Sequence, residues 1–233
     1  MPARSLDRSL IRGLDIFASM QEDDLEAVLE GASARQVPAG TPVFEQGAEA
    51  REFFLLLHGH LKVVQTTPDG QQVVVRHVNP GDIYGIAKAL RRTDYPATSI
   101  AVVDSLTLAW PSSRWDPLVA RNPVLATNAL QTVGQRLQDA HARIRELSTE
   151  EVERRVAHAV LRLVQQAGRK TEEGVLIDFP VTRQDIAEMT GTTLHTVSRV
   201  MSAWEAKGLV ASGRKRIVVL DPHRLVALAD AAE

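Results

Sequence analysis

The sequence contains no cysteine, which excludes disulfide bonds, thiolate metal sites, cysteine-bound iron–sulfur clusters and cysteine nucleophiles. Aromatic residues are scarce at 4%, but hydrophobic residues at 44% are enough to form cores. A length of 233 residues has room for one large domain or two ordinary ones. No apolar run approaches the length of a transmembrane helix, and residues 1–17 lack the uninterrupted apolar core of a secretory signal. We therefore expect a soluble cytoplasmic protein.

Positive and negative charges nearly balance, because the sequence has 27 lysine and arginine residues and 29 aspartate and glutamate residues. A formal net charge of −2 argues against a protein that coats nucleic acid or membrane without selectivity, so any DNA binding must come from a local patch. The sequence also lacks a glycine-rich phosphate loop, a nucleophile elbow and a histidine pair at metal-binding spacing. We expect neither an enzyme nor a metal site.

Residues 181–210 have the pattern of a helix, a tight turn and a second helix. Ala187 is small enough for the second helix to cross closely over the first, and Gly191 lies where the chain must turn at positive φ. Thr192 or Thr193 can cap the second helix. Spacings of 3, 4 and 3 residues predict one buried stripe, made of Leu194, Val197, Met201 and Trp204. The opposite face is polar and consists of His195, Ser198, Arg199 and Ser202.

The segment after Gly208 reads LVASGRKRIVVL, in which two apolar runs flank residues 212–216. This pattern predicts a β-hairpin with a basic tip, placed as a wing beside the second helix. Between Arg183 and Arg216, six basic residues outnumber three acidic ones. The alternative is an ordinary helical hairpin whose polar face is merely solvated. The wing and the local positive charge favour a DNA-binding winged helix.

From Val37 to Trp110 the sequence changes to short apolar runs separated by glycine- and proline-containing turns about ten residues apart. Such spacing predicts an antiparallel β-roll or jelly roll. The preceding segment, from Ser5 to Ala34, reads as short helices. One of them starts with acidic residues near Glu22 and turns three apolar side chains inward, namely Leu25, Val28 and Leu29.

Residues from Trp115 to Leu147 predict one long helix. Its apolar residues recur at alternating spacings of 4 and 3, and they are Ala126, Leu130, Val133, Leu137, Ala140, Ile144 and Leu147. This 3.5-residue repeat is the seam of a two-stranded coiled coil, whereas a helix lying on its own domain needs a broader stripe. The narrow seam favours a helix that pairs with its own copy in a homodimer.

The predicted fold class is therefore α+β. Residues 148–151 are expected to form the hinge and the cap of the next helix, Gly168 to Gly174 a polar loop, and Leu176–Phe179 a strand. The predicted parts are a sensor domain with N-terminal helices over 1–113, a dimerisation helix over 114–148 and a winged helix-turn-helix domain over 149–233.

The run FEQGAEAREFFLLLHGHLKVV, followed by VNPGDIYG, resembles the cyclic-nucleotide-binding fold in its glycines and its Pro-Gly-Asp turn. Together with the winged helix, the resemblance covers nearly the whole chain. The order of β-roll, long helix and winged helix is more specific than any one motif. The chain is thus identified as similar to the CRP/FNR superfamily of bacterial transcription regulators, which implies a homodimer, a pseudo-palindromic double-stranded DNA operator and RNA polymerase as a partner.

In this superfamily the DNA-reading helix face bears Glu, Ser and Arg, and the matching positions here are His195, Ser198 and Arg199. Arg199 can fork onto guanine O6 and N7. His195 departs from the common glutamate and leaves the base read there open. Other residues around the two helices and the wing are expected to contact phosphates, which fix register without reading sequence. They are Thr182, Arg183, Thr193, Thr196, Arg214, Lys215 and Arg216.

The resemblance also places an effector pocket in the β-roll, around Tyr84, Gly85, Ile86, Thr98 and Ser99. Cyclic-AMP-binding members carry a glutamate at the position of Ile86 and an Arg-Ser pair at Thr98-Ser99. The hydroxyl groups of Thr98 and Ser99 cannot supply the positive charge that a buried cyclic phosphate needs as its partner. We therefore expect an effector other than cyclic AMP. The alternatives are another metabolite or cyclic nucleotide, or a protein that is active without an effector.

The segment IYGIAKALRRTDYPATSIAVVDSLTLAW, with TLHTVSRVMSAWE in the second helix, resembles the DNR/NNR-type branch of the superfamily. That resemblance implies nitric oxide sensing through haem and control of denitrification or nitrosative-stress genes. A haem ligand would have to come from the seven histidines, and the candidates in the β-roll are His58, His60 and His77.

Overall fold

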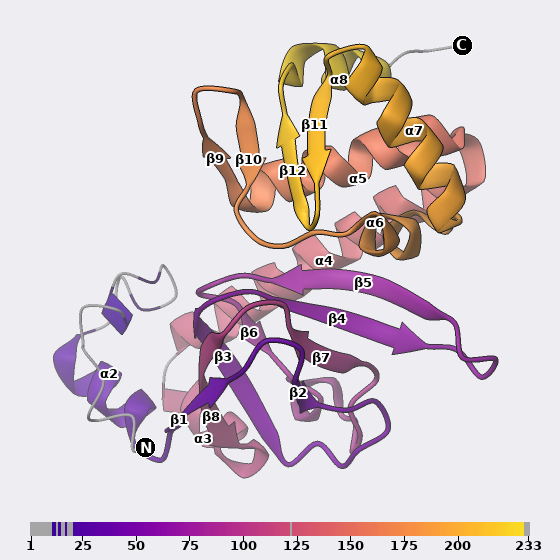
Figure 1. Cartoon of the computed structure of the whole chain (residues 1–233). Coiled ribbons are helices and arrows are strands. Elements are labelled where there is room, and N and C mark those ends of the chain that lie inside the picture. The colour runs from indigo at the N-terminus through magenta and orange to yellow at the C-terminus, as the bar shows by residue number, and fades with distance from the viewer. Residues whose placement is uncertain (1–10, 13, 15–16, 18–20, 122, 231–233) are drawn as a thin grey trace. The chain divides into compact units, whose positions relative to one another are not determined.

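The computed structural model describes residues 11–12, 14, 17, 21–121 and 123–230 (Figure 1). The chain divides into two compact units, the first holding residues 1–71 and 75–137 and the second residues 72–74 and 138–233. The division falls inside helix α4 (Pro123–Thr149), so this helix contributes to both units. In the described part of the chain, no helix is both long and apolar enough to cross a membrane.

The first unit contains two four-stranded sheets. Pairing is antiparallel between β1 and β8, between β3 and β8, and between β4 and β7. One sheet has the order β1 (Ser33–Val37), β8 (Ser105–Pro111), β3 (Glu52–His58) and β6 (Ile83–Tyr84). The other has the order β2 (Pro42–Phe44), β7 (Thr98–Ala101), β4 (Leu61–Thr66) and β5 (Gln72–Val78). The predicted β-roll is confirmed.

Strand β3 is buried on both faces, which explains its continuous apolar run from Phe53 to Leu57. Phe54 and Leu56 belong to a core with Leu61 and Ala101 of the second sheet. The alternate residues of β3 belong to another core, shared with the helices. β3 therefore joins the two cores of the first unit.

The helices of the first unit pack on this second core. Helix α2 (Glu22–Leu29) buries Leu25, Val28 and Leu29, as predicted, while residues 5–10 lie outside the described part of the chain. Two short 3-10 helices, η3 (Lys88–Leu90) and η4 (Ser112–Arg114), follow β6 and β8. Leu118 of α3 (Trp115–Arg121) and Leu125 of α4 complete the core.

The single helix predicted from Trp115 to Leu147 is wrong, because α3 ends at Arg121 and α4 begins at Pro123. A proline disfavours helical backbone at the residue before it and suits the first position of a new helix. All seven residues of the predicted seam lie on α4, so the break leaves the seam on one continuous helix.

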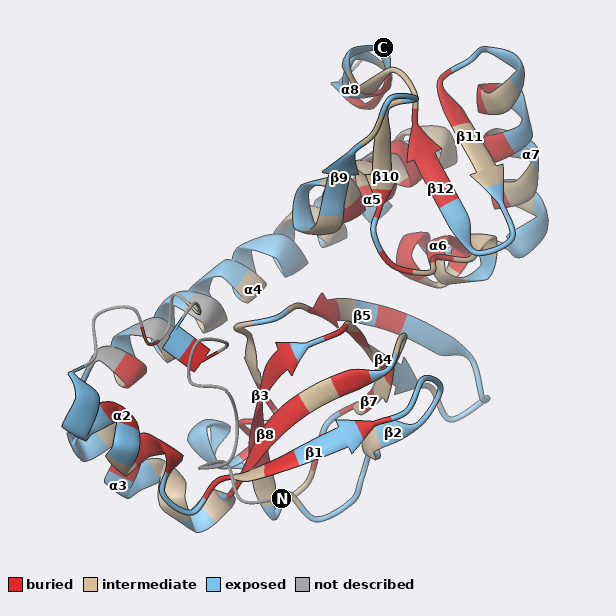
Figure 2. Ribbon diagram, turned by 60° about the vertical axis from the view of Figure 1, so that its left-hand side comes forward, coloured by how far each residue is buried: buried red, intermediate tan, exposed pale blue. Residues whose placement is uncertain are grey.

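The described part of the second unit contains the end of α4, four further helices and a four-stranded sheet, and α5 and α7 contact the sheet (Figure 2). Its helices are α5 (Val152–Ala167), α6 (Arg183–Thr190), α7 (Leu194–Ala206) and α8 (Pro222–Asp230). Its sheet has the order β11 (Val210–Gly213), β12 (Arg216–Val219), β10 (Val175–Ile177) and β9 (Gly168–Lys170). Helix α5 buries Val156, Val160 and Leu163 completely, which makes it the centre of this core.

Two local predictions in this unit need correction. The junction between α4 and α5 falls at Glu150 and Glu151, inside the predicted range, and Glu151 is the N-cap of α5 without a side-chain cap. Ser148 and Thr149, however, are the last residues of α4, where their hydroxyl groups donate to carbonyls one turn back. The expected polar loop from Gly168 begins with strand β9, which pairs with β10. β9 is exposed along its length, so its pairing uses the backbone and leaves no alternating apolar pattern.

Gly59, in the turn between β3 and β4, offers a test of the close packing within the β-roll of the first unit. Its φ is +95°, and a Cβ atom there would lie 2.2 Å from Oγ and 2.8 Å from Cα of Ser105. We expect Gly59→Ala to lower the free energy of unfolding by about 3 kcal/mol or more, since backbone strain adds to a clash that side-chain rotation cannot relieve. The matched control is Gly70→Ala, whose φ of +84° imposes similar strain with no atom nearby. Equal losses in urea denaturation would contradict the clash.

Candidate nucleic-acid interface

Helix α6 is capped at both of its ends. Thr182 Oγ1 accepts from the Asp185 N–H at 3.0 Å, and Asp185 Oδ2 accepts from the Thr182 N–H at 2.9 Å, which completes a capping box at the start of α6. Gly191 ends α6 with φ 62°, and its N–H donates to the Ala187 carbonyl. The predicted turn at Gly191 with positive φ is therefore confirmed, and Ala187, predicted to lie at the crossing of the two helices, is buried.

Helix α7 begins after Thr193, whose hydroxyl accepts from the Thr196 N–H, so Thr193 is the predicted cap. Val197, Met201 and Trp204 are fully buried, and the Trp204 Nε1–H donates to Glu153 Oε1 of α5 at 2.8 Å. This stripe sets the rotation of α7 about its own axis.

Leu194 does not belong to the buried stripe, because its side chain is 47% exposed. It is the first residue of α7, and helical periodicity gives the direction of a side chain without supplying an element to cover it. Leu194 is thus an exposed apolar residue beside His195, a feature that the sequence pattern concealed.

The outward face of α7 is polar. His195, Arg199 and Ser202 are exposed, and Thr196 and Ser198 are half-buried. The predicted base-reading residues therefore lie together on the accessible side of one helix. Arg199 also borders a hollow of about 550 Å³ between α5 and α7, and the lining includes three carboxylates, those of Glu150, Glu151 and Glu153.

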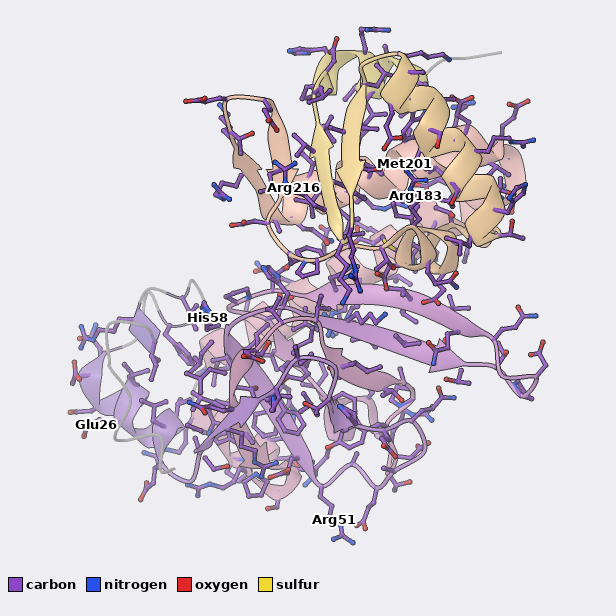
Figure 3. All side chains as sticks on the ribbon, in the orientation of Figure 1. Glu26, Arg51, His58, Arg183, Met201 and Arg216 are labelled. Atoms are coloured by element: carbon purple, nitrogen blue, oxygen red, sulfur yellow. The ribbon has the colours of Figure 1, made fainter. Side chains whose placement is uncertain are left out.

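The β11–β12 hairpin carries the basic tip that the sequence predicts. Gly213 pairs with Arg216, and the two residues between them, Arg214 and Lys215, form the exposed turn. Lys215 has φ 59°, which is unusual for a residue with a side chain. Arg216, labelled in Figure 3, places Nη2 3.3 Å from Oε2 of Glu173. Cations thus concentrate at the tip of the hairpin.

Arg183, labelled in Figure 3, is half-buried and has partners within the second unit. Its Nη2 lies 3.2 Å from Glu205 Oε1 and 2.9 Å from Ser212 Oγ, and the Ser212 hydroxyl also donates to Glu205. The network ties α6, α7 and β11 together and holds the wing beside the second helix. Glu205 and Ser212 were not singled out from the sequence, since they stand 22 and 29 residues from Arg183 and share no local pattern with it.

The seam of α4 is apolar and largely uncovered. Leu130, Leu137 and Ile144, spaced by seven residues, are 72%, 56% and 61% exposed, and Leu147 is 46% exposed. Ala126 is half-buried, Ala140 is exposed, and Val133 packs partly on the core of the first unit. One stripe of large apolar side chains therefore faces outward along the helix.

The five residues of the expected effector pocket do not line one cavity. Tyr84 lies in the core between the sheets, where burial raises the pKa of its hydroxyl and Thr107 Oγ1 lies 2.8 Å away. Ile86 packs in the other core. A Cβ at Gly85, whose φ is +68°, would touch the rings of Phe54 and Phe44.

Thr98 and Ser99, as neighbours on β7, point to opposite faces of the strand. Thr98 Oγ1 accepts from the Gln46 N–H at 3.0 Å, whereas Ser99 is fully buried and its Oγ has no hydrogen-bond partner among the described residues. In the exposed loop that precedes β7 in the sequence, Arg92 pairs with Asp94 at 3.0 Å. No described cation stands in for the missing Arg-Ser pair on β7 itself.

The candidate haem histidines occupy three different settings. His58 is exposed at the end of β3, and His60 Nδ1 lies 3.2 Å from Asn79 Oδ1. His77 on β5 is 6% exposed. Within the described residues, no three histidine, aspartate or glutamate side chains gather into a metal site.

Comparison with known proteins matches both halves of this architecture. The model of the cyclic nucleotide-binding domain matches residues 34–122, and that of the Crp-like helix-turn-helix domain matches residues 154–228. The "Cyclic AMP receptor protein" of Thermus thermophilus is 28% identical over 219 residues, which cover 94% of this chain and 98% of that protein. The chain is a transcription regulator of the CRP/FNR family.

Further relatives of the regulator support this assignment. The "Transcriptional activator protein FnrA" of Stutzerimonas stutzeri is 23% identical over 95% of this chain and 91% of that protein. The crystal structure of TTHB099, a CRP-family transcriptional regulator from Thermus thermophilus, superposes with a TM-score of 0.72 at 26% identity, covering 85% and 97% of the two chains. These relatives are regulators and not enzymes. The names of these relatives point to different branches of the CRP/FNR family and do not single out the DNR/NNR branch. Membership in that branch stays a prediction from the sequence resemblance.

Proposed function

We propose that this CRP/FNR regulator is a homodimer that reads a pseudo-palindromic operator with α7 and responds to a small effector. The observation that carries the proposal is the division of α7 into a fully buried stripe and an exposed polar face. A short helix held in this way presents its N-terminal side chains to a major groove, and the wing adds phosphate contacts.

The α4 stripe supports the homodimer. Exposed leucines in a contiguous row are unfavourable in water, and a second copy of the same helix offers a matching row with the same heptad spacing. Two copies present two α7 helices, so the operator should contain two half-sites about one helical turn apart. RNA polymerase is the partner that a transcription regulator of this family would address.

The effector of this regulator is proposed to be a small molecule other than cyclic AMP. Several relatives are named for cyclic AMP, but here the residue at the position that the resemblance gives to the ribose-binding glutamate is the buried Ile86, and Thr98 and Ser99 bring no cation. Haem binding and nitric oxide sensing are predictions from the sequence resemblance, and the candidate haem ligands in the β-roll are His58, His60 and His77.

Arg199 and Lys215 should affect DNA binding in different ways. We expect Arg199→Ala to remove about 1–3 kcal/mol of preference for an operator selected from random DNA over scrambled DNA. Lys215→Ala should weaken binding to both duplexes evenly and reduce the slope of log affinity against log salt by about one, because one phosphate is no longer neutralised. Fluorescence anisotropy over a salt series measures both quantities. Equal losses on the two duplexes for Arg199→Ala would disprove base reading by this residue.

Leu194 is placed to recognise a thymine methyl group, since it is apolar, exposed and one residue before His195. Replacing the contacted thymine by uracil removes that methyl group, and we expect wild-type binding to weaken by about threefold to tenfold, since one buried methyl contributes about 0.8 kcal/mol. Leu194→Ala should bind the two operators equally. The control Val226→Ala, at a 42% exposed position of α8, should keep the penalty. A penalty that survives in Leu194→Ala would remove Leu194 from the reading face.

Leu137 tests the dimer. An arginine in a coiled-coil seam must be buried without a partner or must force the helices apart, so Leu137→Arg should yield single chains in sedimentation velocity and lose cooperative binding to a two-half-site operator. Leu90→Arg is the matched control, because Leu90 is likewise an exposed leucine, at 53%, but lies on η3 and not on α4. The proposed dimer fails if the wild type sediments as single chains both alone and on its operator.

A further inference from the structure

Glu205 is an acidic residue in a part of the molecule that is expected to face phosphate groups. Between Arg183 and Arg216 three acidic residues stand among six basic ones. Asp185 completes the capping box of α6, and Glu188 accepts a hydrogen bond within α6. Glu205, in contrast, lies in the last turn of α7 and reaches two other elements. A carboxylate there opposes the helix dipole and repels DNA, so its role must offset both effects.

Three side chains from three elements meet at the Glu205 carboxylate. Arg183 Nη2, from the first residue of α6, lies 3.2 Å from Glu205 Oε1 and 2.9 Å from Ser212 Oγ of β11. The Ser212 hydroxyl donates its one hydrogen to Glu205 Oε1 and accepts from Arg183. The three groups thus form a closed ring of hydrogen bonds, in which the carboxylate sets the direction of the hydroxyl group.

This ring gives the wing a second attachment to α7. The first is the short turn at the base of the wing, where the Leu209 N–H donates to the Trp204 carbonyl at 2.9 Å and Gly208 has φ 67°. The tip residues 213–216 are exposed, so core packing does not fix their position. Ser212 directly precedes the tip, and its bond to Glu205 therefore restricts the wing close to the cations that it carries.

We propose that Glu205 is a positioning residue for DNA binding, which holds the wing, through Ser212, and Arg183 where their cations meet phosphate groups. The proposal rests on the proposed function, because it needs the wing to contact the DNA backbone. The side chains of Arg183 and Glu205 are 33% and 32% exposed, so solvent screens the attraction between their charges. The benefit of the ring is therefore mainly geometric, since a wing that is already ordered loses less conformational freedom on binding.

Two substitutions at Glu205 separate position from charge. Glu205→Ala and Glu205→Gln both remove one negative charge, so repulsion alone predicts that both variants bind DNA more tightly and to the same extent. Glutamine keeps an oxygen that accepts from Arg183 and Ser212, whereas alanine keeps none. We expect Glu205→Gln to bind at least as tightly as the wild type. Glu205→Ala should bind about fivefold or more weakly than Glu205→Gln, comparable with the loss of one phosphate contact of the wing.

The measurement is fluorescence anisotropy of the full-length protein on the selected operator and on scrambled DNA, over a salt series. The loss in Glu205→Ala should be even on the two duplexes, because phosphate contacts do not read sequence. The slope of log affinity against log salt should fall by about one.

A double-mutant cycle with Lys215→Ala separates positioning from stability. Lys215→Ala should weaken binding less in the Glu205→Ala background than in the wild type, because the wing is then no longer held where Lys215 meets its phosphate. A Glu205 that serves only the stability of the fold lowers the melting temperature when it is replaced and leaves the effect of Lys215→Ala unchanged.

Ser212→Ala tests the same attachment from the other side, even if Glu205→Ala folds poorly. It removes the bond of the wing and leaves the pair of Arg183 and Glu205, so it should weaken binding as Glu205→Ala does and add no further loss to that variant. The matched control is Glu172→Ala, because Glu172 is an exposed carboxylate of the same unit, between β9 and β10. This control should bind DNA at least as tightly as the wild type.

The positioning role is overturned if Glu205→Ala binds as tightly as Glu205→Gln, or if the effect of Lys215→Ala is the same with and without Glu205. Either result, in a protein whose wild type selects its operator, disproves only the role of Glu205. A wild type that selects no duplex disproves the proposed function instead.

Discussion

The orientation of α7 depends on the packing of Trp204. Its ring is fully buried and its indole N–H donates to Glu153 of α5, while Val197 and Met201 fill the remaining contact. A helix held at these points cannot turn about its axis without exposing an aromatic ring and leaving a buried N–H unpaired. The outward direction of His195 and Arg199 follows from that constraint, and the Arg183 network adds the wing to the same rigid unit.

In the first unit, the corresponding constraint is the burial of β3 on both faces. Because its alternate side chains belong to two cores, a change at this strand affects both the interior of the roll and the contact with the helices. Helix α4 lies in one of these cores through Leu125 and leaves the large residues of its seam outside it. One helix can therefore be fixed to its sheet and still keep a free apolar stripe.

Features that depend on nearby residues were predictable from the sequence. Ala187, Gly191, Thr193 and the strands of the roll follow from spacing, capping and turn chemistry within short segments. Features that depend on partners distant in the sequence were not predictable. The exposure of Leu194 depends on whether another element covers it, and β9 pairs through its backbone. Arg183 meets Glu205 and Ser212 only after folding brings sequence-distant segments together. Asn122-Pro123 carried a readable signal for the break between α3 and α4, which the apolar period masked.

Lys215, at the tip of the wing, has a left-handed backbone conformation that costs stability but keeps a positive charge at the turn. Glycine would adopt φ 59° with little strain, whereas a residue with a Cβ gives up roughly 1 kcal/mol there. The hairpin thus tolerates backbone strain at an exposed turn position that carries a positive charge. If Lys215 contacts a phosphate as proposed, replacing it by glycine would relieve this strain and remove a contact to the DNA backbone, so stability and affinity would be opposed at this residue.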